Sequence, residues 1–177
     1  MIRKLKYYGD PVLRQLCKPV EAITDEIREL VRDMLETMEA HHALGLAAPQ
    51  VGVLLRVFVG CVEYEDEKGE VHAGKPWVYI NPTLKNPSEM LVERSEGCLS
   101  VPKLYLAIPR PMSVVIEAMD VEGNLFTREC TGYLARNVLH ENDHLNGVLF
   151  FDWLKGKRRS EVEPHLRLIK AHYSKKS

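Results

Sequence analysis

The chain has 177 residues, and its 45% hydrophobic and 28% charged content is typical of a globular protein. This length suits one domain with a substantial core, so we expect residues 1–177 to form a single domain. No apolar run approaches the roughly 18 residues that cross a membrane, and the first residues lack the apolar segment of a signal peptide. With four scattered cysteines and a net charge of −1, the composition favours a soluble protein of the reducing cytoplasm.

The first predicted element is a helix that begins after Thr24, a residue type suited to the N-cap position. Apolar residues then recur at helical spacing, which predicts that one face lies in the core. These residues are Ile27, Leu30, Val31, Met34, Leu35 and Met38. His41 and His42 follow the helix. Adjacent residues rarely point at one metal ion, so we interpret both as surface or loop histidines.

A run of small residues, Gly45–Gly52, comes next and contains one amide side chain, Gln50. Small residues let a backbone approach a ligand closely, although the same run also suits a tight turn from a helix into a strand. Beyond it, clusters of β-branched and aromatic residues predict four strands. They are Val57–Val62, Trp77–Ile80, Ser113–Met119 and Asn124–Glu129, with a turn at Asp120–Asn124 between the last two.

The last part of the chain is predicted to be helical. One helix spans Thr131–Asn146 and is ended by Gly147. A final helix is predicted to start between Ser160 and Pro164, because Ser160 begins a capping-box pattern and proline suits a first turn. Hairpins with few βαβ units favour an α+β fold. In it, antiparallel or mixed sheets pack around the helix at 131–146, with further helices near the N- and C-termini.

The pentapeptide His140-Glu141-Asn142-Asp143-His144 is the most informative part of this helix. Residues four apart project from one helix face, about 6 Å apart along the axis. Two neutral imidazoles in this arrangement can bind one metal ion, and Glu141 can reach a water molecule beside that ion. The pentapeptide therefore predicts a metal-dependent hydrolase without saying which one.

The third ligand has several candidates. A metzincin protease would carry a histidine where this chain has Phe150, so that class is excluded. A thermolysin-like enzyme would use a later glutamate, here Glu161 or Glu163. Cys98, in Glu96-Gly97-Cys98-Leu99-Ser100, would complete a set of two histidines and one thiolate with a fourth position open for water. Spacing alone leaves the glutamates and Cys98 as alternatives.

The other three cysteines are interpreted as structural. None forms a Cys-x-x-Cys pair, so neither a zinc-finger knuckle nor a thioredoxin-like motif is present. Cys61 and Cys130 lie in strand-like stretches and are expected to be small buried hydrophobic residues. Cys17 is expected to be structural as well.

Three motifs, in this order, resemble those of the bacterial peptide deformylases. They are Gly45-Leu46-Ala47-Ala48-Pro49-Gln50, Glu96-Gly97-Cys98-Leu99-Ser100 and the stretch from His140 to Gly147. The resemblance spans nearly the whole chain, from Asp10-Pro11-Val12-Leu13-Arg14 to the last helix. It implies hydrolysis of the N-formyl group from the starting methionine of new polypeptides, with release of formate.

The resemblance also implies roles for individual residues. Cys98, His140 and His144 match the metal ligands, and Glu141 matches the catalytic carboxylate. Gln50 and the backbone N–H of Leu99 match the donors that polarise the formyl oxygen. Substrate contacts are expected from Gly45, Leu46, Gln50, Glu96 and Leu99. The expected metal is Fe(II), with zinc, nickel or cobalt as substitutes, and the expected partners are N-formylmethionyl nascent peptides.

Three positions depart from the usual pattern of the family. Leu139 stands where glutamine is common, and it is expected to alter packing beside His140. Ala43 stands where glycine is frequent, and it is expected to narrow the substrate groove. Tyr105 replaces a basic residue, which affects how the peptide is recognised but not the hydrolysis. Asp143 is a candidate to orient the ligands through a hydrogen bond.

The net charge conceals an asymmetry. Residues 155–177 contain eight Lys or Arg and two Glu, whereas residues 1–154 contain sixteen basic and twenty-three acidic side chains. This segment is either a solvated helix or a contact with ribosomal RNA, whose phosphates bind clustered cations without regard to sequence. An inactive relative or a broader zinc peptidase is the competing functional class. Retention of Glu141, Gln50 and all three ligands argues against the inactive relative and leaves the peptidase as an alternative. The sequence gives no indication of the oligomeric state.

Overall fold

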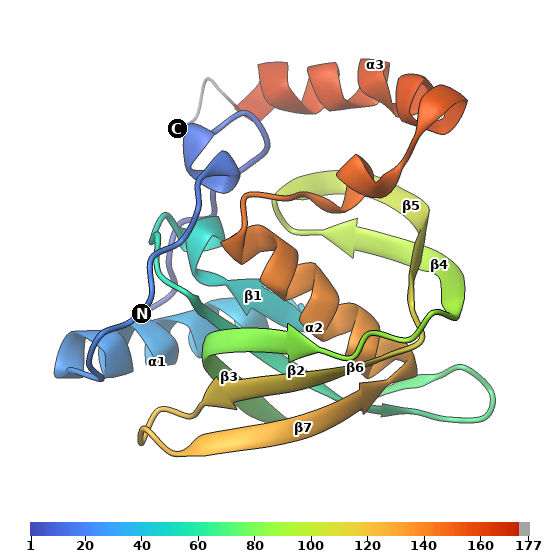
Figure 1. The fold of residues 1–177 in the computed structure, drawn as a ribbon. Helices are drawn as coiled ribbons and strands as arrows, with labels where there is room; N and C mark the ends of the chain where they lie inside the picture. The colour runs from blue at the N-terminus through green and yellow to red at the C-terminus, as the bar shows by residue number, and fades with distance from the viewer. Residues whose placement is uncertain (174–177) are drawn as a thin grey trace.

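Two antiparallel sheets lie on either side of the helix that carries His140 and His144 (Figure 1). The structure is a computed structural model and describes residues 1–173. The larger sheet has the strand order β1-β2-β3-β6-β7, and the smaller sheet pairs β4 with β5. The strands are β1 Gly45–Ala47, β2 Val57–Glu65, β3 Val71–Lys85, β4 Leu91–Cys98, β5 Val101–Pro111, β6 Ser113–Met119 and β7 Leu125–Thr131. The helices are α1 Asp25–Ala40, α2 Gly132–Leu145 and α3 Gly156–Tyr173, with short 3-10 helices η1 Pro11–Arg14, η2 Ala48–Val51 and η3 Phe150–Trp153.

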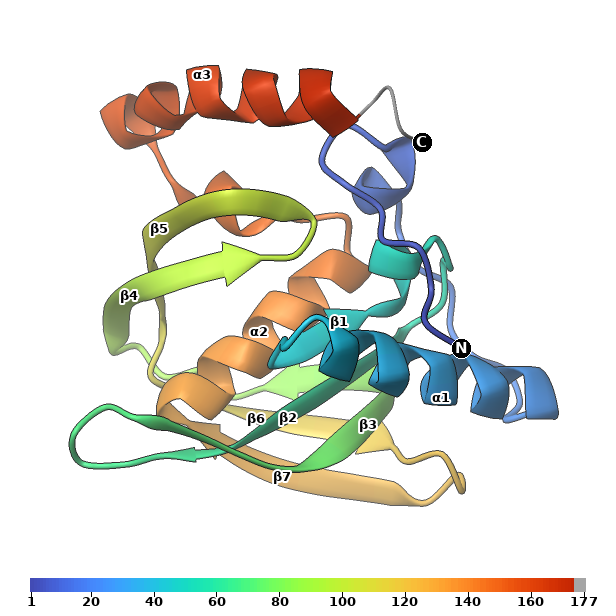
Figure 2. The ribbon, with the colours of Figure 1, turned by 180° about the vertical axis from the view of Figure 1, so that it is seen from behind.

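The two faces of β2 belong to different parts of the core, because successive side chains of a strand point to opposite sides. Val57 lies in one buried cluster with Met34 of α1. Its neighbour Phe58 lies in another with Val138 of α2. The larger sheet is therefore covered by α1 on one face and by α2 on the other (Figure 2).

The smaller sheet is covered by the C-terminal part of the chain. Ile108 of β5, Phe151 of η3 and Ile169 of α3 share a third buried cluster. α3 therefore lies over one side of β4 and β5, and α2 lies on the other (Figure 1). In both ribbon views β4 lies between β5 and β1, so an edge of each sheet faces the other.

The predicted α+β class is confirmed, and so are most of the predicted elements. α1 starts after Thr24, although no side-chain hydrogen bond from Thr24 caps the helix. β6 spans the predicted Ser113–Met119, and α2 fills its predicted range apart from the cap residues Thr131 and Asn146. The other three predicted strands lie within β2 and β3 or overlap β7. No helix among residues 1–173 combines the length and apolar character needed to cross a membrane.

The predicted start of the last helix is wrong. α3 begins at Gly156, before the predicted range of Ser160 to Pro164, and it continues through Pro164. An interior proline removes one helix hydrogen bond at a cost of about 3 kcal/mol or more. Burial of Leu166 and Ile169 against β5 and η3 holds the helix together across this position.

Three strands, β1, β4 and β5, are absent from the sequence-based prediction. β1 has only three residues, and β4 interleaves charged and small residues that suggest a loop. β5 contains Pro102, Pro109 and Pro111, which ordinarily argue against a strand. A two-stranded sheet tolerates these prolines because each strand has an edge that needs no backbone donor.

Candidate active site

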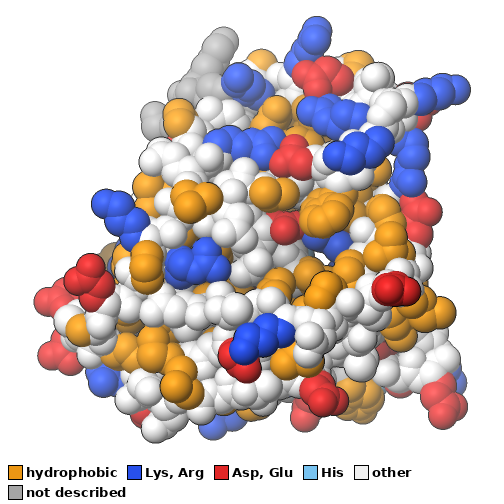
Figure 3. Space-filling view, in the orientation of Figure 1, with side chains coloured by type: hydrophobic (Ala, Val, Ile, Leu, Met, Phe, Trp, Pro, Cys, Tyr) orange, Lys and Arg blue, Asp and Glu red, His pale blue; other side chains and the backbone are white. Residues whose placement is uncertain are grey.

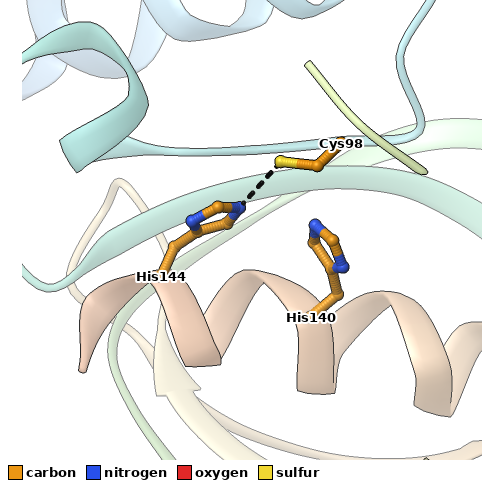
Figure 4. Close-up of side chains that lie close together, drawn as sticks. All are labelled: Cys98, His140 and His144. Carbon is orange, nitrogen blue, oxygen red and sulfur yellow. Dashed lines mark hydrogen bonds between the residues drawn. The ribbon is translucent and has the colours of Figure 1, made fainter. Parts of the chain in front are cut away.

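Three potential metal ligands converge where β4 ends above α2. The Sγ atom of Cys98 lies 3.3 Å from Nε2 of His144, and the rings of His140 and His144 are 5.1 Å apart between centroids. One ligand atom from each of these residues lies within 4.8 Å of the others. Figure 4 shows both imidazoles rising from the same helix face toward the thiol. The i and i+4 spacing of the pentapeptide produces this convergence, as predicted.

Gln50 is fixed so that its amide nitrogen faces the cluster. Its Oε1 accepts a hydrogen bond of 2.8 Å from the Ala47 N–H, which leaves Nε2 pointing away from β1. Nε2 lies 3.5 Å from the Sγ of Cys98 and 3.2 Å from the Oγ of Ser100. Gly52, at φ +83°, ends the short helix η2 that carries Gln50, so the turn requires a residue free to adopt this conformation.

The Glu141 carboxylate lies beside the cluster and against β1. Its Oε2 is buried and has no hydrogen-bond partner among residues 1–173. A side chain at Gly45 would place its Cβ 2.8 Å from the Cδ of Glu141, so glycine makes room for the carboxylate. Burial raises the pKa of Glu141 to about 7. The structure thus leaves one carboxylate oxygen free beside the three potential ligands.

Glu96 fixes the orientation of His140. Its Oε2 accepts a hydrogen bond of 3.0 Å from Nδ1 of His140, which leaves Nε2 of that ring available for a metal. Both carboxylate oxygens of Glu96 also accept hydrogen bonds from Arg110, at 2.9 and 3.0 Å. Arg136 adds a further bond to Oε1 at 2.6 Å. Both oxygens of Glu96 are thus engaged in holding His140 and the two arginines, while the expected contact of Glu96 with substrate stays a prediction.

The network around Glu96 extends to the far side of α2. Nη1 of Arg110 donates to Oδ2 of Asp143 at 2.6 Å, and Nε1 of Trp153 donates to the same oxygen at 2.8 Å. Asp143 therefore acts one step further from the ligands than expected, through Arg110. Neither Arg110 nor Arg136 could be recognised from the sequence, since a lone arginine in a strand or helix carries no motif. Both are almost completely buried, and buried arginines need anionic partners.

Burial and hydrogen bonds shift the pKa values of the side chains in and around the cluster. Burial lowers the pKa of His144 well below its usual value. Burial also opposes charge on His140, but hydrogen bonds to Cys98 and Glu96 outweigh it and raise the pKa of His140. Burial would likewise raise the pKa of Glu96, yet its bonds to His140 and Arg110 hold it at about 2. A neutral His144 ring is in the state that a metal ligand requires.

A cavity of about 550 Å³ opens beside the cluster. Its lining includes Gly45, Gln50, Cys98, Leu99, His140 and Glu141. Ala43 and Tyr105, two of the three departures from the family pattern, line it as well. The third departure, Leu139, packs beside the core cluster between α2 and the larger sheet. His41 is exposed, as predicted, although it lies at the rim of the cavity.

Several expected site residues lie elsewhere. Leu46 is completely buried in the cluster under α1, so only its backbone can meet a substrate. Glu161 and Glu163 lie on α3, where they pair with Lys157 and Arg159. Neither glutamate joins the two histidines in the group of possible ligands found within residues 1–173. The thermolysin-like alternative for the third ligand is therefore not supported.

The cysteines that were interpreted as structural differ in burial. Cys17 and Cys130 are buried as expected, and burial raises the pKa of each thiol to about 11. Cys61 is only partly buried, with its sulfur near the carbonyl oxygens of Ala43 and Leu44. These three thiols are not members of the metal-ligand group.

A second group of possible ligands, Asp66, Glu70 and His72, lies on the hairpin between β2 and β3. Asp66 Oδ1 accepts bonds from the N–H groups of Lys68 and Glu70, and Oδ2 contacts His72. These contacts are accounted for by the turn of the hairpin.

The donor set fits a divalent transition metal. One thiolate and two imidazoles suit a borderline-soft ion, and three protein ligands leave a position for water or substrate. A buried carboxylate with a free oxygen beside such a centre is the arrangement of a metal-dependent hydrolase. The fold and site therefore define this class of enzyme.

Comparison with known proteins gives the family. The sequence model of the polypeptide deformylase family matches residues 2–160. The chain is 40% identical to the peptide deformylase of Maricaulis maris over 168 residues, which cover 95% of this chain and 94% of that protein. It is 43% identical to that of Acinetobacter baumannii over 162 residues, with 92% and 88% coverage. The crystal structure of the Thermus thermophilus peptide deformylase superimposes with a TM-score of 0.87 at 39% identity, covering 100% of both chains.

The chain belongs to the polypeptide deformylase family. It is accordingly a metal-dependent hydrolase that removes the N-formyl group from nascent polypeptides.

Proposed function

We propose that the chain removes formyl groups from N-formylmethionyl peptides by means of a divalent metal ion held by Cys98, His140 and His144. The observation that carries the proposal is the convergence of these three ligand atoms within 4.8 Å beside the buried Glu141. A bound divalent cation polarises a carbonyl group and lowers the pKa of water from 15.7 to about 7. Groups of this protein are proposed to transfer the proton, bind the formyl oxygen and bind the peptide.

Glu141 is proposed as the general base and acid. Its unpartnered Oε2 is available to take a proton from the attacking water and later to deliver it to the departing amine. Proton transfer by a positioned side chain contributes roughly 10²–10⁴-fold to the rate of such reactions. Gly45 supports this role because its lack of a side chain lets the carboxylate lie beside β1.

Gln50 and Leu99 are proposed to bind the formyl oxygen as negative charge develops on it. The Gln50 amide is already oriented by its bond from Ala47, so its Nε2 needs little reorganisation. Leu99 follows Cys98 directly and lines the cavity. Loss of one donor of this kind costs about 10²–10³ in rate in other hydrolases.

An extended peptide is proposed to bind between the facing edges of β1 and β4. Each of these strands pairs with only one neighbour in its sheet among the described residues. A peptide can add to such edges through backbone hydrogen bonds, in the manner of an additional strand. Gly45 on β1 and Gly97 on β4 both line the cavity. Leu46 would contribute its backbone alone.

The test is a comparison of two substrates with the metal-loaded protein. Formyl-Met-Ala should release formate, and an unformylated peptide of the same length should remain uncleaved. Cleavage of the unformylated peptide would favour a general peptidase. Absence of both reactions would favour an inert relative of the enzyme.

Fe(II) is proposed as the metal used in the cell, with zinc, nickel or cobalt able to replace it. A thiolate with two imidazoles suits any of these ions better than magnesium. Metal analysis of anaerobically purified protein should find iron predominant. Iron beside a thiolate is open to oxidation along with the sulfur, so the iron form should lose activity in air faster than the nickel form. Equal lifetimes would count against iron.

A ribosomal contact is proposed for the basic C-terminal segment. Lys and Arg side chains gather at the top of the molecule in the region of α3 (Figure 3). Arg158 contacts Glu93 and Arg159 pairs with Glu163, so these two cations already have partners within the fold. Lys157 has a looser partner, because its Nζ lies 3.8 Å from a carboxylate oxygen of the exposed Glu161. Charge reversal is therefore best made at Lys155 and Lys157, and at Lys175 and Lys176, which lie outside the described residues. Ribosome co-sedimentation should fall with these changes and with salt, while hydrolysis of formyl-Met-Ala stays near normal. Salt-insensitive, unchanged co-sedimentation would contradict the contact.

A single domain at residues 1–177 and a cytoplasmic location are also proposed. Four unpaired thiols favour a reducing compartment. Fractionation of the source cells, with the protein detected by antibody, tests the location. A single cooperative unfolding transition would support one domain, and two separate transitions would contradict it.

A further inference from the structure

Tyr105 of β5 is an exposed aromatic residue beside the active site. Its side chain is 74% exposed, yet it lines the same cavity as the potential metal ligands. The ring lies against the backbone of Gly97 in the adjacent strand. A Cβ at Gly97 would come within 2.6 Å of Cε1 and 2.8 Å of Cδ1 of the ring. Because position 97 is glycine, the ring can rest on β4 one residue before Cys98.

The position of Tyr105 distinguishes it from the other exposed apolar side chains. Single exposed apolar residues are common and need no function. Met90 and Leu125 are such cases, because neither lines the cavity. Tyr7 and Tyr173 line it, but their rings stack on each other at 4.1 Å. Within residues 1–173 no aromatic ring is paired with Tyr105, so its outer face is open to a ligand in the groove.

We infer that Tyr105 is a specificity-determining residue for the peptide substrate. It contacts one side chain downstream of the formylated residue and favours an apolar or aromatic side chain there. The inference rests on the proposed function, since it requires an extended peptide between β1 and β4. A peptide that runs along the β4 edge away from Cys98 passes Gly97, and the Tyr105 ring lies on that glycine.

The geometry of an extended peptide limits the contact with Tyr105 to one substrate position. Successive side chains of a strand point to opposite faces. Only one of the second and third substrate residues can therefore meet the Tyr105 ring. Aromatic rings prefer stacked or edge-on contacts with other rings and bury large areas when they pair. A preference for phenylalanine over serine should thus occur at one of these two positions and not at both.

The experiment compares kcat/KM for formyl peptides that carry phenylalanine or serine at the second or the third position. The metal-loaded wild-type enzyme should favour phenylalanine at one position by about three- to tenfold. Tyr105→Ala should reduce this ratio to about one, and Tyr105→Phe should retain it. Tyr64→Ala is the matched control, since Tyr64 is 52% exposed and its ring stacks on His72 outside the cavity. The ratio should be unchanged in this control.

The experiment distinguishes failure of the Tyr105 inference from failure of the proposed function. Normal formate release with the same ratio in Tyr105→Ala as in the wild type, or with no preference in the wild type, would overturn the inference alone. If the wild-type enzyme released formate from none of the peptides, the proposed function would fail, and the inference with it.

Discussion

Arg136 of α2 donates a hydrogen bond of 2.6 Å from Nη1 to Oε1 of Glu96 in β4, and both side chains are almost fully buried. Arg136 also donates to the carbonyl oxygens of Val92 and Ile108 in the smaller sheet. One side chain of α2 is thus hydrogen-bonded to both strands of this sheet. Because α2 carries the two histidines and β4 carries the thiol, these bonds hold the two halves of the metal site together.

Replacement of Arg136 by methionine should therefore be severe. Arg110 still pairs with Glu96 in this variant, but Glu96 loses one buried cation and the carbonyl oxygens of Val92 and Ile108 lose their donor, at a cost of about 1–3 kcal/mol for each group left unsatisfied. Denaturant unfolding of the metal-loaded protein measures this loss, and competition with a chelator measures the accompanying loss of metal affinity. Lys85→Met is the matched control, because Lys85 of β3 pairs with Glu117 of β6 and both side chains are about half exposed. It should cost at most about 1 kcal/mol. Equal losses in both variants would contradict the structural role of Arg136.

Glu141→Gln should separate metal binding from catalysis. The carboxylate is not one of the three converging ligands, so the variant should bind metal normally. It cannot accept and return the proton, so kcat should fall by about 10²–10⁴-fold. Metal content and formate release measured on one preparation check both statements. Turnover within a few-fold of the wild type would remove Glu141 from the mechanism.

The four thiols should differ in reactivity toward iodoacetamide at pH 8. Burial and a pKa of about 11 should protect Cys17 and Cys130 until the protein unfolds. Cys98 should be protected only while metal is bound, and chelation should expose it. Mass spectrometry of the alkylated peptides follows each site. Rapid labelling of Cys98 in the metal-loaded protein would show that its sulfur is not a ligand.

Gly45→Ala should impair catalysis more than folding. The new Cβ would lie 2.8 Å from Cδ of Glu141 and 2.8 Å from Nδ2 of Asn137. Displacement of a catalytic carboxylate by about 1 Å can cost 10²-fold in rate. Gly74→Ala is the control, because the atoms nearest its Cβ belong to the side chain of Glu63, which is exposed, and its carboxylate can move away. Steady-state kinetics should give a much lower kcat/KM for Gly45→Ala than for Gly74→Ala. Similar kcat/KM values for the two variants would exclude the idea that a side chain at position 45 displaces Glu141.

The site was more predictable from the sequence than the fold was. The histidine pair and Glu141 follow from helix periodicity, and the motif around Cys98 came from resemblance. The Glu96 network could not be predicted, because the partners Arg110 and Arg136 are fourteen and forty residues away. Only the pairing of β4 with β5 and their packing on α2 bring these side chains together.

The errors in the sequence-based prediction of the fold have a common physical cause. Local patterns describe what a segment prefers alone, whereas packing decides what it forms. Pro164 indicates a helix start in the sequence, but Leu166 and Ile169 bury a helix that continues past it. In β5 the prolines mask a strand that forms because β4 supplies its partner. Each error lies where tertiary contacts outweigh local preference.

X-ray absorption spectroscopy at the metal edge tests the central claim most directly. Zinc-reconstituted protein should show one sulfur neighbour at about 2.3 Å and two imidazole nitrogens at about 2.0–2.1 Å. The sulfur signal should vanish in Cys98→Ser, while the nitrogen signals remain. A first shell without sulfur in the wild-type protein, or a sulfur signal that persists in Cys98→Ser, would contradict the assignment of Cys98, His140 and His144 as the metal site.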